Sequence, residues 1–451
     1  MKVGRMVIGL SSVLLVLMAG ATPGRAAAGT LRLSLPDAVR MALSDGAAAR
    51  LATLRVQEAQ GVQGQVRSAL LPQVDAQASA GSNMLNLNTM GLSMPGLGPV
   101  IGPYGLYDAH VSAAMNVVDV AALRRYRAAQ QGVRLSEAEQ RRISFEVAAA
   151  VSQLYVQVQR ADAAVGACAA TVELFARLRD LASDQWQAGV ATRLDSLRAE
   201  VQLTREEQNL LTARSQRDQV RLALLRVIGA DLSQEVLLTD SLAGPQRDAP
   251  TLEGALAAAR RDRPELAAAD AAVRAAELAV SAVSAEYLPT LGLQAKVGSD
   301  GSHLDELDEV HSVFAAVSVP IFNGGRTAAA MAAARARARQ AALARDEAAR
   351  QVEEDVRRTL TAHESAAGRV VLATQSLGLA EQELAVATDR FAHGVSTSVE
   401  VDNAQNTLSA ARQAHVGALA DEAQTWHELA RATGRVMELV PERGVEPGRN
   451  M

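Results

Sequence analysis

The chain has 451 residues, a formal net charge of -5 and an apolar content of 49%. These values describe an ordered protein with room for more than one structural unit, and they differ from the low hydrophobicity and high net charge of a disordered chain. Arg and Glu are interspersed and form no basic stripe, so nucleic acid is not an expected partner. Aromatic residues make up only 3% of the chain, which favours closely packed helices over a thick globular core.

The N-terminus has the order of a secretory signal peptide, which we expect to span residues 1–28. Positively charged residues precede an apolar run from Met6 to Ala19, and the small residues 26–29 form an Ala-x-Ala-like cleavage site. A retained anchor is the less favoured alternative, because a spanning helix needs about 20 apolar residues. Cys168 is the only cysteine, so packing and not an internal disulfide must hold the exported fold.

The rest of the chain is a tandem duplication. A shift of 217 positions carries Leu71-Pro72 onto Leu288-Pro289, and a later shift of 205 positions carries Gly229 onto Gly434. The first copy is therefore longer by about twelve residues, which we expect in an exposed loop after Gly81. We divide the chain into a first repeat (29–228), an inter-repeat linker (229–250), a second repeat (251–437) and a C-terminal tail (438–451).

Each repeat opens with a predicted helix, which begins at the cap Ser34 or Thr251 and ends at the Leu-Pro step. Alternating apolar and polar residues then predict two strands per repeat. Their length of about ten residues fits a tilted strand of a membrane barrel. The strands are expected near 72–81 and 109–118 in the first repeat, and near 289–298 and 310–320 in the second.

Two loops join the paired strands. The first, Ser82 to Tyr107, is rich in Gly, Met, Leu and Pro, and the second, Asp300 to Glu309, is acidic. We interpret the second as a hydrated extracellular loop and the first as a variable loop that contains the additional residues; constriction of the outer mouth by the first loop is the less favoured alternative. Calcium binding by the acidic loop is the less favoured alternative, because its spacing is not that of an EF-hand.

A very long helix is predicted after each returning strand, from near Arg124 and near Arg326. Apolar or small residues recur at alternating spacings of four and three from Val147 to Val172, which is a coiled-coil seam. A helix of about 65 residues is on the order of 100 Å long, too long for a compact domain. The seam includes Cys168 and, in the second copy, His363, and we interpret both as packing residues.

Each long helix is expected to reverse at a Gly-Val-x-Thr turn and return as a second helix to Gly229 or Gly434. Four strands cannot close a membrane barrel alone, because an open edge in lipid leaves backbone groups without partners. The barrel must therefore be shared among chains, and a barrel that continues into a helical tube is a conduit.

The order of these features resembles the TolC family of outer-membrane efflux proteins. The resemblance runs from Leu33 to about Met437, and no single motif is diagnostic. The first copy departs from it at Val117–Ala122, which lacks the Pro and Gly-Gly of the second copy. The resemblance is carried by Leu71-Pro72, the Val-Pro-Ile-Phe-Asn-Gly-Gly-Arg segment at 319–326, the two Gly-Val-x-Thr turns, and Gly229 and Gly434.

The resemblance implies an α+β membrane protein in which a homotrimer shares a twelve-stranded transmembrane β-barrel in the outer membrane and continues as a coiled-coil tunnel in the periplasm. It implies a periplasmic adaptor and an inner-membrane pump of the RND, ABC or MFS type as partners, with outer-membrane lipid around the barrel. The function would be the exit duct of an efflux or type I secretion system. The cargo cannot be read from the chain.

The resemblance also implies a gate, because channels of this family narrow at the periplasmic end through acidic rings one helical turn apart. Glu400 and Asn403 match those positions, with Asp402 beside them, and the first copy has Asp195 and Arg198 at the corresponding sites. Three Glu400 side chains on one axis would favour cations, and Arg193 or Arg198 could hold the ring shut. A solvated helix face is the alternative reading.

The turns themselves are the expected contact with the adaptor. Glycine explains the reversal of the helices, since it tolerates positive φ; adaptor contact is what the resemblance adds for the residues around it. The expected contact residues are Gly189, Val190, Thr192, Gly394, Val395 and Thr397.

Two other classes of protein compete with the channel. One is a periplasmic coiled-coil adaptor or scaffold without a barrel, which is disfavoured because the chain has two equivalent hairpins separated by pairs of bilayer-length strands. The other is an enzyme. The seven histidines form no HExxH motif, Cys-His cluster or nucleophile-base pattern, so neither catalysis nor a metal or other cofactor is expected.

Overall fold

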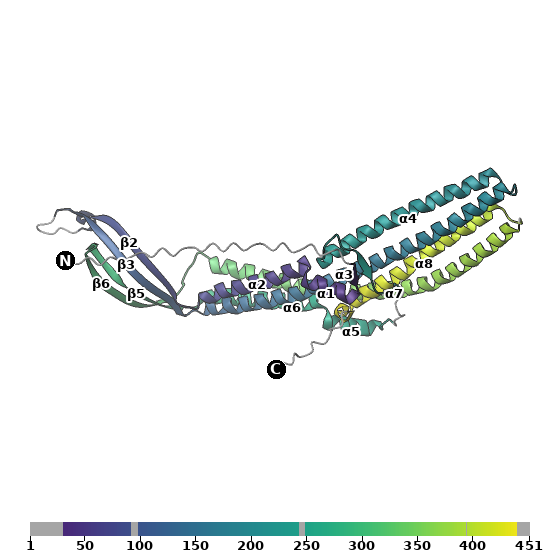
Figure 1. Cartoon of the computed structure of the whole chain (residues 1–451). Helices are drawn as coiled ribbons and strands as arrows, with labels where there is room; N and C mark the ends of the chain where they lie inside the picture. The colour runs from purple at the N-terminus through teal and green to yellow at the C-terminus, as the bar shows by residue number, and fades with distance from the viewer. Residues whose placement is uncertain (1–29, 92–97, 243–248, 394, 440–451) are drawn as a thin grey trace, which may run out of the picture.

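The computed structural model describes residues 30–91, 98–242, 249–393 and 395–439. The expected signal peptide and most of the expected tail lie outside these ranges. The molecule is elongated, with a curved sheet at one end, two long helical hairpins at the other and shorter helices between them (Figure 1). None of the helices in the described ranges is both long enough and apolar enough to cross a membrane.

The helices repeat in the same order in the two halves of the chain. Each half has two shorter helices before its strands and two longer helices after them. The helices of the first half are α1 (Leu35–Ser44), α2 (Ala47–Ser68), α3 (Val120–Gln187) and α4 (Arg193–Ile228); those of the second are α5 (Leu252–Asp262), α6 (Pro264–Ser284), α7 (Arg326–Ala392) and α8 (Ser398–Ala432).

The opening helix of each repeat is broken, so the prediction of one continuous helix was wrong. In the first repeat, Asp45 ends α1 and Gly46 adopts an extended conformation before α2. In the second, Pro264 begins α6 and holds Arg263 in an extended conformation, because a proline disfavours helical geometry in the residue before it. The predicted caps hold, since the side chains of Ser34 and Thr251 accept hydrogen bonds from the first turns of α1 and α5.

Four antiparallel strands form one sheet in the order β2-β3-β5-β6. They are β2 (Gln73–Asn86), β3 (Val100–Val118), β5 (Thr290–His303) and β6 (Glu306–Ser318). All are longer than the expected ten residues, because strand pairing continues into the segments predicted to be loops. The acidic loop is reduced to a short turn between His303 and Glu306, whereas β2 and β3 are joined by residues 87–99, where the longer first copy has its additional residues.

The two faces of this sheet have opposite character. Asp75 lies in register with Ser112, Lys296 and Ser312, and the adjacent row is Val74, Ala113, Ala295 and Val313. On the polar face, Asp108 contacts the His110 ring through a hydrogen bond and forms an ion pair with Lys296 at 3.2 Å. On the apolar face, Val74 and Val313 are 67% and 69% exposed. The sheet therefore presents an apolar surface that a single chain leaves uncovered.

The segment expected to be only an inter-repeat linker contains a strand, which corrects that interpretation. β4 (Val236–Leu238) pairs in parallel with β1 (Leu31–Leu33) just before α1. Beside this pair, Asp240 accepts hydrogen bonds from the backbone N–H of Leu35 and from the hydroxyl of Tyr155. These contacts tie the linker to the start of the first repeat and to the middle of α3.

Equivalent glycines close both repeats against equivalent partners. Gly229 ends α4 with φ +74°, and a Cβ there would lie 2.8 Å from the carbonyl oxygen of Asp45. Gly434 follows α8 with φ +82°, and a Cβ would lie 2.7 Å from Asp262 Cβ. The duplication thus includes the contact between the end of one helix and the end of another, and both positions exclude a side chain.

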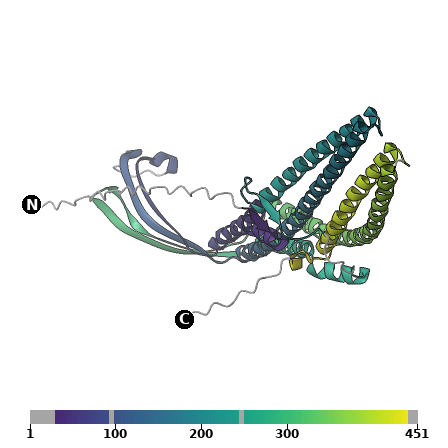
Figure 2. The ribbon, with the colours of Figure 1, turned by 45° about the vertical axis from the view of Figure 1, so that its right-hand side comes forward.

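The coiled-coil seams are buried where the long helices pair. Val147, Val151 and Val158 on α3 lie in the main apolar core with the ends of α1 and α4. In the second repeat, His363 is only 3% exposed and packs beside Trp426 of α8, which confirms a packing role. The hairpins α3/α4 and α7/α8 lie side by side as two helical pairs (Figure 2).

Candidate functional site

The first hairpin tip is a tightly capped reversal between α3 and α4. Gly189 has φ +73°, and the backbone N–H of Val190 donates to the carbonyl of Gln185 at 2.9 Å. Thr192 and Asp195 form a reciprocal capping box, in which the Asp195 carboxylate accepts the backbone N–H of Thr192 at 3.1 Å and its hydroxyl at 2.6 Å. Asp195 therefore stabilises the start of α4.

The second tip lacks this box. Thr397 occupies the same position before α8, but its side chain makes no capping hydrogen bond. The Glu400 carboxylate instead accepts a hydrogen bond from the Ser396 hydroxyl at 2.6 Å. Gly394, expected to contact an adaptor, lies outside the described residues. The two turns thus share a sequence pattern but differ in the role of their acidic residue.

Apolar side chains project from both tips. Val190 is 76% exposed and Val395 is 67% exposed, and Gly189, Thr192 and Thr397 are also exposed. The turns between α3 and α4 and between α7 and α8 lie at the end of the molecule farthest from the sheet (Figure 1). An exposed valine at each tip is a feature that a partner surface could cover.

The expected gate residues divide into two groups. Glu400 and Asn403 are exposed, three positions apart and thus on one side of α8. Asp402 is half-buried and faces a groove between the two hairpins. Arg198 lies 3.9 Å from Asp195, and among the described residues no ion pair joins Glu400 to Arg193 or Arg198.

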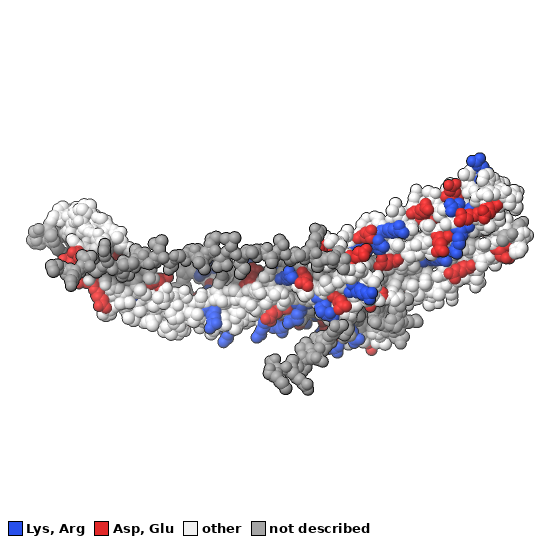
Figure 3. All heavy atoms as spheres, viewed as in Figure 1, with Lys and Arg blue, Asp and Glu red and all other residues white. Residues whose placement is uncertain are grey.

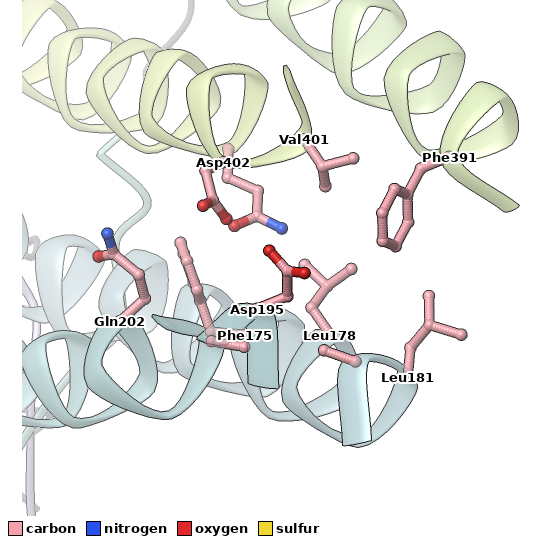
Figure 4. Close-up of a pocket in the computed structure, with 11 residues that line it drawn as sticks. Phe175, Leu178, Leu181, Asp195, Gln202, Phe391, Val401 and Asp402 are labelled. Atoms are coloured by element: carbon pink, nitrogen blue, oxygen red, sulfur yellow. The ribbon is translucent and has the colours of Figure 1, made fainter. Parts of the chain in front are cut away.

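The groove brings together acidic residues that the sequence placed in separate repeats. Figure 4 shows Asp195 of α4 and Asp402 of α8 projecting into the same space, with Phe175, Leu178 and Phe391 around them. Gln405, which the sequence did not single out, also lines the groove and is only 2% exposed. Only the fold could show this pairing, because the two aspartates are about two hundred positions apart in the chain.

The environment of Asp402 favours its neutral form. Burial has the largest effect and raises the pKa of Asp402; Arg198 lowers it, and the carboxylate of Asp195 raises it by a smaller amount. No group of three or more potential metal-ligating His, Cys, Asp or Glu side chains occurs in the described ranges. The groove therefore contains two carboxylates in largely apolar surroundings.

Charge is distributed differently over the sheet and the hairpins. Acidic and basic side chains are interspersed along the helical hairpins, whereas the visible face of the sheet is largely uncharged (Figure 3). Such a distribution separates a water-facing part of the molecule from a part with a weakly polar outer surface.

Comparison with known proteins gives a consistent result. The family model "Outer membrane efflux protein" matches residues 39–230 and 255–435. The alkaline protease secretion protein AprF of Pseudomonas aeruginosa is 25% identical over 334 residues, which cover 72% of this chain and 69% of AprF. The outer membrane efflux protein BepC of Brucella suis is 31% identical over 173 residues, covering 36% of each chain.

Solved structures share the fold at low sequence identity. The Campylobacter jejuni CmeC outer membrane channel has a TM-score of 0.79 at 18% identity, over 89% of this chain and 85% of that one. The outer membrane protein VceC of Vibrio cholerae has a TM-score of 0.75 at 20% identity, over 89% and 96% of the two chains. The arrangement of sheet and hairpins is therefore an established architecture.

Proposed function

Because the chain belongs to the outer membrane efflux protein family, we propose that three copies close into one export duct, with a shared barrel in the outer membrane and a helical tunnel in the periplasm. The chain is an outer-membrane channel protein, as its family is. The match along nearly the whole chain disfavours the alternative of a barrel-free periplasmic scaffold. We propose a homotrimer with a twelve-stranded barrel, and a periplasmic adaptor and an inner-membrane pump as its partners.

The observation that carries the proposal is the incomplete, two-faced sheet. β2 and β6 are its edges, and no strand within the described ranges pairs with their outer backbone groups. A barrel in lipid must close without edges, so β6 of one copy is expected to pair with β2 of the next. The apolar row that includes Val74 and Val313 then faces lipid, and the polar row that includes Lys296 faces the lumen.

The helical hairpins support the same assembly. On α7, Leu372, Leu379 and Val386 recur every seven residues, and all three are more than half exposed. On α4, Val201 and Leu211 are 67% and 69% exposed. An apolar stripe at heptad spacing is the pattern of a coiled-coil contact, so a neighbouring copy would bury what a single chain exposes.

We further propose that the duct receives its cargo from an inner-membrane pump through a periplasmic adaptor that contacts the hairpin tips. Of the two similar proteins, one is named for secretion of a protease and the other for efflux. An RND, ABC or MFS pump would supply the energy and set the cargo, because the duct shows no catalytic constellation in its described residues. The exposed valines at both tips are the proposed adaptor contacts.

The gate is proposed at the tip of the second hairpin. Three exposed Glu400 side chains around the trimer axis, with Asn403 one turn further, would form a ring that attracts cations. Asp195 and Arg198, the corresponding residues of the first copy, are instead engaged with the start of α4 and with each other. The constriction would therefore be built mainly by the second repeat.

Conductance of the Glu400→Gln variant tests this proposal. Removing three negative charges is expected to lower the preference for cations roughly fivefold, the factor that corresponds to about 1 kcal/mol of lost attraction. The measurement is the reversal potential across a planar bilayer under a salt gradient, with Glu381→Gln on the exposed side of α7 as the matched control. A channel with unchanged selectivity would exclude Glu400 from the constriction, and absence of any conductance from the wild-type protein would contradict the duct itself.

A further inference from the structure

The groove between the two hairpins contains more hydrogen-bond acceptors than donors. Asp195 enters it from α4 and Asp402 from α8 (Figure 4). The side-chain carbonyl oxygen of Gln405, one turn after Asp402 on α8, is buried and has no hydrogen-bond partner. A buried acceptor left without a donor costs about 1–3 kcal/mol, so a missing donor in this groove is energetically significant.

The walls of the groove do not satisfy this oxygen. Gln202 of α4 lines the groove, but its side-chain amide does not hydrogen-bond the buried Gln405 oxygen, which has no partner. The side chains lining it from α3 are Phe175, Leu178, Leu181 and Ala182, none of which can donate a hydrogen bond. α7 contributes Phe391. The nearest basic group is Arg198, which is exposed and lies 3.9 Å from Asp195 on its own helix. The charged groups that act on Asp402 are thus Arg198, which lowers its pKa, and Asp195, which raises it by a smaller amount.

A proton on Asp402 would satisfy these requirements together. A neutral carboxyl group has one O–H donor, and Gln405 lies three positions further along the same face of α8, within reach of that donor. Neutralisation also removes the repulsion between two carboxylates in apolar surroundings, where charge is expensive unless it is paired. Asp195 already accepts two hydrogen bonds from Thr192, so its charged form is the better stabilised of the two.

We propose that Asp402 is a proton-operated latch between the two hairpins. With its proton, the Asp402 carboxyl donates within the groove and α8 stays packed against the α3/α4 hairpin. Without it, the buried Asp402 carboxylate is destabilised by its apolar surroundings and by the nearby Asp195, and the tips separate. The effect on opening rests on the proposed duct, whereas the protonation of Asp402 does not.

The direction of the pH dependence follows from the environment. Burial and the Asp195 charge raise the pKa of Asp402 in the closed arrangement above that of a solvated aspartate. The stability that the proton gives to the closed arrangement is fully present below the ordinary aspartate pKa and is lost as pH rises through the raised value. The duct should therefore open as the pH rises.

Conductance of the purified full-length protein from about pH 5 to about pH 9 tests the latch. The wild-type channel is expected to open as pH rises, with the protonated fraction of Asp402 falling about tenfold per unit above its pKa. Asp402→Asn keeps the shape and a donor without a charge, so it should stay closed throughout. Glu400→Gln is the control, because it should lose cation preference and keep the pH response. A wild-type response in Asp402→Asn overturns the latch.

Infrared spectroscopy of the same proteins tests the protonation of Asp402 independently of whether the protein forms a conducting channel. In wild type, but not in Asp402→Asn, the carbonyl stretch of one protonated carboxyl group should persist to a pH above the ordinary aspartate pKa, even if no conductance is found. Addition of Ca²⁺ or Mg²⁺ provides the remaining arm. The latch is contradicted if these ions close the channel, Asp402→Asn abolishes that closure, and wild type shows no band of a protonated carboxyl group. The groove would then bind a cation, and Asp402 would not be protonated.

Discussion

At the scale of single residues, the role of an acidic side chain near a hairpin turn depends on the direction in which the fold points it. Asp195 was expected at a gate from its position after the first turn. In the structure it caps α4 and shares a groove with Asp402, while Glu400, its nearest counterpart by sequence, is exposed. Sequence position thus predicted that both carboxylates lie near the hairpin turns, but not the direction in which each carboxylate points.

Tyr155 provides a residue-scale prediction of stability. Its hydroxyl donates to Asp240 at 2.8 Å and lies 3.0 Å from the carbonyl oxygen of Leu33, and burial raises its pKa above the usual tyrosine range. Tyr155→Phe leaves two acceptors without this donor and should lower the free energy of unfolding by about 1–3 kcal/mol.

Thermal unfolding in detergent, followed by helical circular dichroism, measures this loss. Tyr287→Phe is the matched control, because Tyr287 is 52% exposed. Equal unfolding temperatures for the two variants would show that the Tyr155 hydroxyl does not hold the linker to the first repeat.

At the scale of elements, periodicity predicted the strands and long hairpins because both patterns are local. The break at Pro264 also has a local signal, which is the proline itself. Asp45-Gly46 gave a weaker signal of the equivalent break. β1 and β4 were missed, because three-residue strands carry too little pattern and their pairing joins segments about two hundred positions apart.

The hairpin tips provide the element-scale prediction. Val190 and Val395 are exposed at equivalent turns, so an adaptor that docks on the repeats should contact both. In a Cys168→Ala background, Val190→Cys and Val395→Cys should each crosslink to the adaptor, about tenfold more efficiently than a cysteine at Leu211, which is exposed far from the tips.

The measurement is the fraction of the channel protein that shifts to the crosslinked mass in cells that express the partner adaptor. Crosslinking from only one tip would limit docking to one repeat. Crosslinking at position 211 that equals that at the tips would place the contact along the hairpin and contradict the proposal.

At the scale of the whole molecule, the single chain is incomplete at both ends. The sheet has two open edges, and the hairpins carry exposed apolar stripes. The sequence could indicate this incompleteness, because four strands are too few for a membrane barrel. Neither the open sheet edges nor the apolar stripes determine the number of copies, so the trimer remains a prediction.

The stripe on α7 offers a test of assembly that leaves the fold of one chain intact. Leu379 is 66% exposed and lies outside the apolar cluster formed by α7 and α8. Leu379→Glu should therefore fold normally but place a charge where a neighbouring hairpin is expected. Burying that charge would cost several kcal/mol, which is enough to weaken the oligomer by roughly a thousandfold.

Outer-membrane fractions run on SDS gels without and with heating give the readout. The wild-type protein should migrate as a heat-dissociable oligomer, whereas Leu379→Glu should yield mainly monomer. Glu381→Lys, two positions further on the same helix, also changes a charge but at a position that is already polar, and it should leave the oligomer unchanged. If both variants retain the wild-type oligomer, the stripe on α7 faces solvent and does not contact a neighbouring copy. The oligomer would then be held by pairing of the sheet edges and not by this stripe.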